Sequence, residues 1–282
     1  MTKQERTSTG DIRRIYIDRR EREGGYNMAS HHCHPYYELC CVESGACRFL
    51  VEDKLYDLHE GDQLLIPPQI FHHTRYLFGP CKRSGVYFRF TDLDRSVVEQ
   101  LPGQDAFFSQ VQVFRIPEAD RTRYSELLSH MEAEERTRDE RSPLLLRLQL
   151  QELFLLCGRC GVFLRDEPTT IHAADQQILR AARFINEHFR QQISSAEIAA
   201  AAGFSPNYLS RKFRETADIG VHEYLVFVRL RSAAMELIST DDSITYIATH
   251  CGFSDSNYFK DAFKKKYGVT PREYRSHYKG QK

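Results

Sequence analysis

Roughly the last hundred residues of this chain contain one pattern twice, and no other feature constrains the fold as strongly. The sequence Ile-Ala-Ala-Ala-Ala-Gly-Phe-Ser at 198–205 returns as Ile-Ala-Thr-His-Cys-Gly-Phe-Ser at 247–254. Each copy is followed by a second match, Asn-Tyr-Leu at 207–209 and Asn-Tyr-Phe at 257–259. Both units read as a helix, a tight glycine turn and a second helix. This pattern is typical of the helix-turn-helix module, whose second helix can lie in the major groove of DNA.

Capping residues mark where the helices of the two units begin and turn. Ser194 is placed to cap the first helix, and Glu197, three residues later, completes a capping box. Gly203 stands where the chain must reverse, a position that suits a positive φ. Ser205 and Ser254 are expected to cap the second helix of each unit. The two units therefore follow the same local plan.

A connecting helix and a last helix complete this region. Residues 226–238 carry apolar side chains at helical spacing, so they read as one helix between the two units. Thr270 and Glu273 form a further capping box, which predicts another helix start. A rigid connector would fix the distance between the two second helices, and adjacent major grooves on one face of DNA lie about 34 Å apart. The alternative is a plain helical repeat, but two copies of roughly 50 residues are too few for a stable array.

The two halves of the chain differ in charge. The 282 residues together have a net charge of zero, but residues 175–282 hold 16 Lys and Arg against 12 Asp and Glu. The remainder of the chain therefore has a net charge of −4. A basic part joined to an acidic part fits a segment that binds DNA joined to a segment that does not.

The C-terminal segment, over roughly residues 175–278, resembles the AraC/XylS family of bacterial transcription regulators. The shared motifs are the two glycine turns, the connector sequence Arg-Leu-Arg-Ser-Ala at 229–233 and the tail at 263–275. The resemblance implies a cytoplasmic homodimer whose partners are double-stranded promoter DNA, RNA polymerase and a small-molecule effector, with a carbohydrate as the first guess. It also implies that base-facing residues lie early in the second helix of each unit.

The residues expected to contact DNA are polar or charged and lie on the second helix of each unit: Asn207, Ser210, Arg211, Arg214, Ser256, Asn257, Lys260, Asp261, Lys264 and Lys265. Arginine suits guanine and asparagine suits adenine. Arg214, Lys264 and Lys265 are better read as phosphate contacts, which position a protein without specifying sequence. Asp261 departs from the basic or amide residues usual at such a position. It either accepts a hydrogen bond from a cytosine amino group or is a salt-bridge partner that contacts no base.

The N-terminal half, over residues 12–115, reads as a series of short strands. Turn signals separate apolar or aromatic runs at 36–42, 47–52, 63–66 and 85–90. Short strands at such even spacing favour an antiparallel barrel or sandwich.

Histidine and glutamate residues form a spaced pattern within these strands. His32, His34, Glu38 and His72 match the spacing of the two cupin motifs, and the segment around them resembles a cupin. Gln69 departs from those motifs, because cupins often have glycine there. In cupin enzymes the equivalent residues bind a divalent metal, and imidazole and carboxylate suit Fe, Mn, Ni or Zn. The alternative, which the resemblance to AraC-type regulators favours, is that the residues bind a small molecule without a cofactor.

The middle of the chain is helical by its pattern. Residues 118–140 are strongly charged with an apolar stripe, and Ser-Pro at 142–143 opens a leucine-rich helix. That helix is apolar beyond one face, so it must pack against the barrel, another helix or a second chain. The resemblance favours a dimer contact, and packing within the domain is the alternative. The Cys-x-x-Cys at 157–160 is expected to pack in a core or interface, since no second pair completes a zinc site. Residues 165–174 read as a linker.

Together these features predict an α+β chain of several domains. Residues 1–117 form a cupin-like antiparallel β-barrel that senses a ligand, residues 118–174 a helical dimerisation segment and linker, and residues 175–282 an all-α double helix-turn-helix domain. No signal peptide is visible, and the most apolar stretch, at 144–156, is too interrupted to span a membrane. We expect a transcription regulator, not an enzyme, that binds specific DNA sequences under the control of a small molecule. The alternative is a metal-dependent cupin enzyme that carries a DNA-binding module.

Overall fold

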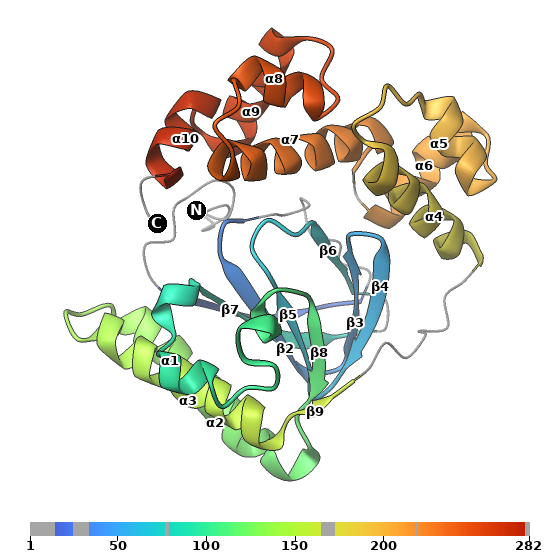
Figure 1. Cartoon of the computed structure of the whole chain (residues 1–282). Coiled ribbons are helices and arrows are strands. Elements are labelled where there is room, and N and C mark those ends of the chain that lie inside the picture. Colours follow the sequence, from blue (N-terminus) through green and yellow to red (C-terminus); the bar gives the residue numbers. More distant parts are fainter. Residues whose placement is uncertain (1–14, 25–33, 77–78, 165–172, 218, 280–282) are drawn as a thin grey trace, which may run out of the picture. The chain divides into compact units, whose positions relative to one another are not determined.

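The computed structural model (Figure 1) describes residues 15–24, 34–76, 79–164, 173–217 and 219–279. The chain divides into two compact units, one made chiefly of residues 10–170 and the other chiefly of residues 171–282. We call the first the barrel unit and the second the helical unit. None of the described helices is long and apolar enough to cross a membrane.

Antiparallel strand pairs make up the two sheets of the barrel unit. The larger sheet has the strand order β1-β7-β2-β5-β8-β9 and the smaller one β4-β3-β6. The strands are β1 (Tyr16–Arg22), β2 (Tyr37–Ser44), β3 (Ala46–Val51), β4 (Lys54–His59), β5 (Asp62–Ile66), β6 (His72–Arg75), β7 (Cys81–Phe88), β8 (Gln112–Arg115) and β9 (Val162–Phe163). The four predicted runs correspond to β2, β3, β5 and β7, and β7 begins at Cys81 rather than at Gly85.

Strand β2 shows how sheet geometry divides the core. Successive side chains of a strand point to opposite faces of the sheet. Cys40 and Val42 accordingly lie in one core together with Phe49 of the smaller sheet. Leu39 and Cys41 lie in a second core, on the other face of the large sheet. Because both faces of β2 are buried, its sequence is a continuous apolar run rather than an alternating one.

Helices α2 (Glu118–Thr137) and α3 (Ser142–Cys160) pack on the outer face of the large sheet (Figure 1). Leu146, Leu150 and Leu153 of α3 are buried in the second core, and so is Cys157 of the Cys-x-x-Cys motif. Four other leucines of α3 are 63, 41, 56 and 42% exposed, namely Leu144, Leu145, Leu148 and Leu155. Packing within the unit therefore accounts for only one face of this helix. Shorter helical segments are η1 (Phe90–Asp92), α1 (Arg95–Val98) and η2 (Gln104–Phe108).

A buried ion pair ties α2 to the large sheet. The guanidinium of Arg19 on β1 forms a two-point contact with the carboxylate of Glu43 on β2. The same carboxylate accepts hydrogen bonds from Ser84 Oγ of β7 at 2.6 Å and from Ser125 Oγ of α2 at 3.1 Å. Three strands and one helix thus meet at a single carboxylate.

Seven helices form the described part of the helical unit. They are α4 (Ala173–His188), α5 (Ser195–Ala202), α6 (Pro206–Ala217), α7 (Val221–Ser239), α8 (Ile244–His250), α9 (Ser256–Tyr267) and α10 (Pro271–Lys279). The connector α7 is longer than the apolar pattern predicted. Of the predicted linker, residues 165–172 lie outside the described residues, and Ala173 and Ala174 already belong to α4.

Local capping residues define most of these helix boundaries, as predicted. Ser194 and Glu197 form a capping box, with the Ser194 N–H donating to the Glu197 carboxylate at 2.8 Å and the Glu197 N–H donating to Ser194 Oγ at 3.2 Å. Thr270 and Glu273 form the second predicted box. Such boxes depend only on neighbouring residues, so they can be read from sequence.

One predicted cap is wrong. Ser254 does not cap α9, because α9 begins at Ser256 and Asp255 is its N-cap. The Asp255 carboxylate accepts hydrogen bonds from the N–H groups of Asn257 at 2.7 Å and Tyr258 at 3.3 Å. The second turn is one residue longer than the first, which moves the helix start by one position. A carboxylate at this position also interacts favourably with the helix dipole.

Candidate functional sites

The second helices of the two modules, α6 and α9, each have one buried and one exposed face. Leu209 and Phe213 of α6 and Phe259 and Phe263 of α9 are at most 1% exposed. Of the ten residues predicted to contact DNA, nine are exposed and Ser256 is half-buried. An apolar face that anchors the helix thus leaves its polar face available to a ligand.

Weak ion pairs hold the two arginines of α6. Arg211 is 70% exposed at its side chain, with its Nε 3.8 Å from Glu215 Oε1 and its guanidinium carbon 5.3 Å from the centre of the Tyr208 ring. The Nη2 atom of Arg214 lies 3.2 Å from Glu223 Oε2 of α7. Exposed pairs of this kind are worth at most about 1 kcal/mol. Each arginine can therefore leave its ion pair and bind a stronger anionic partner.

The position of Asp261 bears on the two alternatives for its role. In the described part of the chain, Asp261 forms no ion pair, although Lys260, Lys264 and Lys265 lie on the same helix. The salt-bridge alternative therefore has no support in the described residues.

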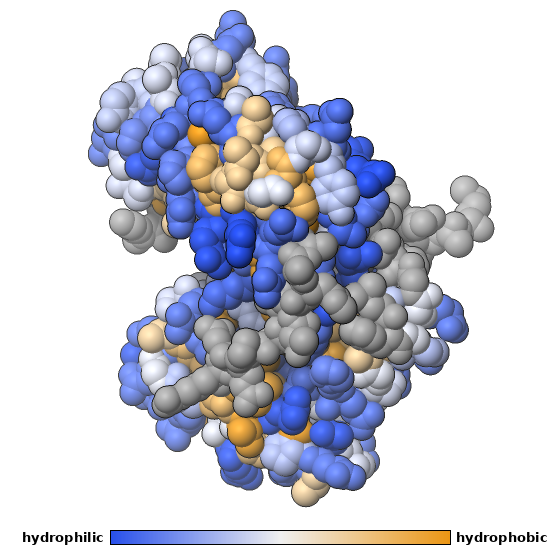
Figure 2. Space-filling model, turned by 90° about the vertical axis from the view of Figure 1, so that its right-hand side faces the viewer, coloured by the Kyte–Doolittle hydropathy of each residue, from blue (hydrophilic) through white to orange (hydrophobic). Residues whose placement is uncertain are grey.

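The surface of the helical unit is largely hydrophilic on the face that Figure 2 shows, with one apolar patch in the upper part of the view. Small exposed residues also occur on α5, where Ala196, Ala200 and Ala201 face solvent.

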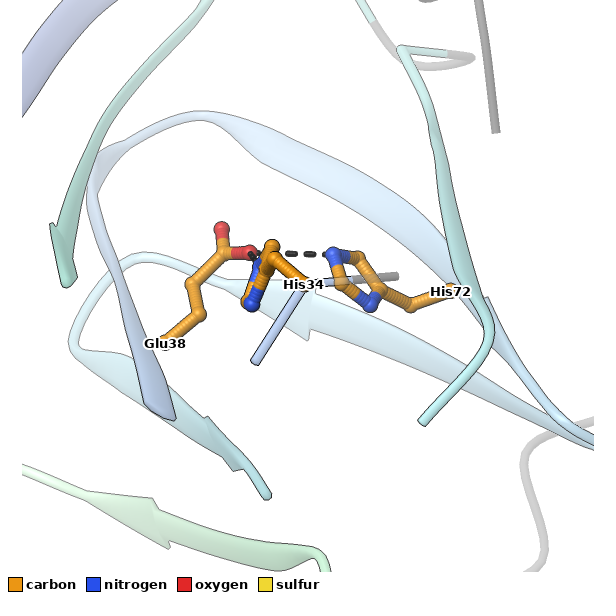
Figure 3. A group of neighbouring side chains, drawn as sticks. All are labelled: His34, Glu38 and His72. Carbon is orange, nitrogen blue, oxygen red and sulfur yellow. Dashed lines mark hydrogen bonds and ion pairs between the residues drawn. The ribbon is translucent and has the colours of Figure 1, made fainter. Parts of the chain in front are cut away.

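A second candidate site lies inside the barrel unit, where three of the four cupin-like residues meet (Figure 3). The Oε2 atom of Glu38 lies 3.1 Å from His34 Nε2 and 3.0 Å from His72 Nε2. His34 is 7% exposed, and Glu38 and His72 are each 2% exposed. We call these three residues the His–Glu cluster. The fourth predicted residue, His32, lies outside the described residues.

Each imidazole of the His–Glu cluster lies between two acceptors. His34 Nδ1 is 2.8 Å from the carbonyl oxygen of Tyr36, and His72 Nδ1 is 3.0 Å from that of Ile70. A neutral imidazole has a single N–H, so it can donate to its carbonyl or to Glu38 but not to both. Both contacts of a ring are favourable when the ring is protonated, or when a cation binds between the Nε2 lone pairs and the carboxylate.

Strand β7 supplies two further partners of Glu38 that the sequence analysis missed. The hydroxyl of Tyr87 donates to Glu38 Oε1 at 3.2 Å, and Arg83 Nη1 lies 3.5 Å from the same oxygen. Gly85 lies between them on the same face of the strand, and a Cβ there would be 2.8 Å from the Tyr87 hydroxyl oxygen. The sequence would have revealed both residues if the predicted strand had begun at Cys81, because alternation along a strand places Arg83 and Tyr87 on one face.

Burial and charge act in opposite directions on the His–Glu cluster. Burial alone would raise the pKa of Glu38, but hydrogen bonds with His34 and His72 and the charge of Arg83 outweigh it and hold that pKa well below its usual value. Burial lowers the pKa of His34 despite its hydrogen bond to Glu38, which favours the neutral ring. Burial also raises the pKa of Tyr87, so its phenol keeps the proton that it donates. Glu38 is accordingly the anionic centre of this network.

Gln69, where the cupin motifs often have glycine, has a φ of +63°. This left-handed conformation is one that glycine adopts without cost, which explains the usual preference at the position. The N–H of Gln69 donates to the carbonyl of His34 at 2.9 Å. The turn at Gln69 thus holds the segment before β6, which carries His72, against the segment that carries His34.

The cupin resemblance implies a divalent metal, and the residues present fit one. The three ligand atoms of the His–Glu cluster all lie within 4.8 Å of one another. Histidines that bind metals usually donate their other N–H to a carbonyl or carboxylate, which matches the contacts of both Nδ1 atoms. Glu38 Oε1 would keep its hydrogen bond from Tyr87.

A cavity of about 40 Å³ lies elsewhere in the barrel unit, where β2 and β5 meet α2. Its lining includes Cys41, Gln63 and Tyr124 but no member of the His–Glu cluster. It has space for water but not for a sugar ring.

Comparison with known protein families gives two matches. Residues 17–154 match the AraC-like ligand binding domain, and residues 198–277 match a helix-turn-helix domain. The first match extends from the second residue of β1 through β8 and α2 into α3. The second extends from α5 into α10.

Individual relatives match over different lengths. The HTH-type transcriptional activator RhaS of Klebsiella pneumoniae is 26% identical over 246 residues, which covers 86% of each chain. The uncharacterized HTH-type transcriptional regulator YijO of Escherichia coli is 39% identical over 127 residues, 45% of this chain and 44% of that one. The solved C-terminal domain of AraT, a response regulator from Geobacillus stearothermophilus, is 35% identical, with 36% of this chain and 84% of that chain covered and a TM-score of 0.35.

Proposed function

This chain belongs to the AraC/XylS family of DNA-binding transcription regulators, and we propose that a small molecule bound in its barrel unit controls how its helical unit binds DNA. The observation that carries the proposal is the pair of helices α6 and α9, which present polar residues over buried apolar faces. Control by a ligand would shift DNA affinity by a coupling free energy of about 1–3 kcal/mol, or roughly 5–150-fold. The enzyme alternative is not favoured, because the relatives are named as transcription regulators.

The proposed base contacts lie early in the two second helices, on α6 at Asn207, Ser210 and Arg211 and on α9 at Asn257, Lys260 and Asp261. Arginine would donate to guanine, asparagine would pair with adenine, and Asp261 would accept from cytosine. Arg214, Lys264 and Lys265 would contact phosphates and Ser256 would lie at the edge of this surface. The exposure of nine of these ten side chains supports the assignment.

The proposed effector site is the His–Glu cluster of His34, Glu38 and His72, with His32 as a further candidate. Its polar atoms converge inside the barrel, which also contains the apolar core of Cys40, Val42 and Phe49, and such a mixture is usual in a small-molecule site. A carbohydrate is the effector class we favour. A divalent metal, if bound, would be held by His34, Glu38 and His72 and would supply a Lewis acid to which an oxygen-rich effector could bind. In this proposal residues 1–117 sense the ligand, 118–174 mediate dimerisation and 175–282 bind DNA.

A thermal-shift screen of metal-stripped protein against sugars, with and without Zn²⁺ or Mn²⁺, tests the effector site. We expect stabilisation by one ligand class, because a ligand at 100 times its dissociation constant adds about 2.7 kcal/mol to the state that binds it. A shift with sugar alone supports the metal-free site, and a shift only with metal supports metal at the His–Glu cluster. No shift in either arm would contradict a sugar or metal effector at this site.

Matched histidine variants locate the binding event. His72→Gln removes one member of the His–Glu cluster, and His130→Gln changes an exposed histidine of α2. We expect the first variant to lose the ligand-induced shift and the second to keep it. Equal shifts in both variants would place the ligand elsewhere.

A homodimer through α3 would cover the leucines that packing within the barrel unit leaves exposed. Leu144, Leu148 and Leu155 lie four and then seven residues apart, so they fall on one side of the helix. We propose that a second copy of this chain covers them. The dimer would act in the cytoplasm and contact RNA polymerase, as the family resemblance implies.

Leu148→Glu should weaken this dimer at least about fivefold, because an unpaired polar group in an apolar interface costs about 1–3 kcal/mol. Sedimentation velocity of the full chain over a concentration series measures the effect. Val162→Glu is the matched control, since Val162 is also 56% exposed and lies on β9 rather than α3. A Leu148→Glu variant that dimerises like the wild type would exclude α3 as the interface.

A further inference from the structure

The two helix-turn-helix modules contact each other at a second place besides the connecting helix α7. The segment that follows α4 and leads into the first module meets both α7 and the glycine turn of the second module. We call this contact the module junction and define it as residues 189–192, Arg229, Glu236, His250 and Gly252. All of these residues lie in the helical unit.

Arg229 of α7 forms the buried part of the module junction. It is 8% exposed, and its Nε and Nη2 atoms donate to the carbonyl oxygens of Phe189 and Gln191, each at 2.7 Å. In the described part of the chain no carboxylate pairs with this guanidinium. Burying a charge is costly unless the charge is hydrogen-bonded. The guanidinium therefore keeps both carbonyl oxygens within hydrogen-bonding distance. The contact therefore fixes the 189–192 segment on α7.

Gly252 forms the part of the junction that belongs to the second module. Its φ is +88°, and a Cβ added there would lie 2.4 Å from the carbonyl oxygen of Phe189 and 2.8 Å from Arg229 Nε. Gln192 Nε2 donates to the carbonyl of Gly252 at 2.9 Å. The second turn thus packs directly on the segment that leads into the first module.

The equivalent glycine of the first module makes no such approach. Gly203 has a similar φ of +72°, but a Cβ there would meet only Gln177 Nε2, at 3.5 Å. The two glycines occupy the same place in the repeated sequence, and both have a positive φ. They differ in that Gly252 packs against the segment leading into the first module and against α7, and Gly203 therefore provides an internal control.

An exposed set of polar contacts continues the junction at the surface. Arg190 Nη2 donates to Glu236 Oε1 at 2.9 Å, and His250 Nδ1 lies 3.0 Å from Glu236 Oε2. Arg190 comes before the first module, Glu236 is on α7 and His250 ends α8. These exposed contacts are individually weak, so the buried contacts of Arg229 and Gly252 dominate the junction.

We propose that the module junction, and not α7 alone, fixes the separation and angle of α6 and α9, and that Arg229 and Gly252 thereby determine which half-site spacing the protein accepts. This inference rests on the proposed contact of both helices with DNA. A single connecting helix fixes the distance along its axis but allows bending and rotation at its ends. A second attachment removes that freedom. One base pair inserted between half-sites moves the second half-site by about 3.4 Å and rotates it by roughly 35°, which a rigid pair of modules cannot follow.

The test begins with operator selection from random-sequence duplex DNA by the full-length wild-type chain. Binding is then measured to the selected DNA with one base pair inserted or deleted between two neighbouring blocks one helical turn apart, the spacing expected for α6 and α9 of one chain. We expect the wild type to lose at least about tenfold in affinity for either change, comparable to one mismatch or more. Gly252→Ala should bind the selected DNA more weakly and lose less than about threefold further on insertion. Gly203→Ala should also bind more weakly but keep the wild-type penalty.

Gln192→Ala is a second variant of the module junction, and it keeps the proposal testable if the Gly252→Ala chain does not fold. It removes the hydrogen bond to the second turn without placing a Cβ in the contact, and residue 192 is exposed. It should reduce the insertion penalty by a smaller factor at unchanged thermal stability. Wild-type penalties in every folded junction variant would overturn the proposal. If the wild type selects a single block, the two-helix contact itself is wrong, which is a different result.

Discussion

Replacing Arg211 and Lys260 together with alanine is expected to weaken binding to the selected operator by about 2–6 kcal/mol, because a side chain that contacts a base is worth about 1–3 kcal/mol. This corresponds to roughly 30- to 20,000-fold in the dissociation constant. Both side chains are exposed, one on each second helix, and neither is buried in a core that the change would disrupt. A fluorescence-anisotropy titration at fixed salt measures the loss.

The control variant removes the same two charges from the other unit. Arg95 and Arg136 are exposed on α1 and α2, and changing both to alanine lowers the net charge equally. It should leave sequence-specific affinity close to that of the wild type. If the Arg211→Ala, Lys260→Ala variant bound the operator as tightly as this control, α6 and α9 would not be the helices that contact bases.

Features that depend on neighbouring residues are among those predicted correctly from sequence. The capping box at Ser194 and the second box at Thr270 form because each involves residues three apart. The error at Ser254 has the same origin: two adjacent residues could cap α9, and the longer second turn places Asp255 at the N-cap, where its carboxylate accepts two N–H groups. The sequence pattern allowed either boundary.

The barrel interior shows what local patterns do not reveal. Glu38 and His34 lie four residues apart, and motif spacing identified both. Arg83 and Tyr87 reach Glu38 only through the pairing of β2 with β7, in which Glu38 is opposite Tyr87. That register depends on contacts between segments distant in sequence. The exposed face of α3 is a similar case, because a leucine-rich pattern alone does not indicate which leucines the sheet covers.

Glu43→Gln is expected to cost about 3 kcal/mol of unfolding free energy, because breaking a buried ion pair leaves an uncompensated charge, which typically costs about 3–5 kcal/mol. The side chains of Arg19 and Glu43 are 10 and 7% exposed. The lower end of the range applies because Glu132 Oε2, 3.8 Å from Arg19 Nη1, remains as a partial partner. Urea unfolding at neutral pH measures the change. Glu126→Gln, at an exposed position of helix α2, should be neutral.

The pH dependence provides an independent check on the same carboxylate. Burial alone would raise the pKa of Glu43, but hydrogen bonds from Arg19 and Ser84 and the nearby positive charges lower it below its usual value. A carboxyl whose pKa is lower in the folded state than in the unfolded state contributes stability above the unfolded value of about 4.3, and that contribution is lost as the pH falls from there through the folded value. The wild type should therefore lose stability more steeply than Glu43→Gln as the pH falls below about 5.

Replacing Arg19 and Glu43 together with methionine should recover most of the loss at neutral pH, because no charge is then left buried without a partner. If the double variant were instead as unstable as Glu43→Gln, packing around Arg19 rather than its charge would be what holds α2 to the sheet.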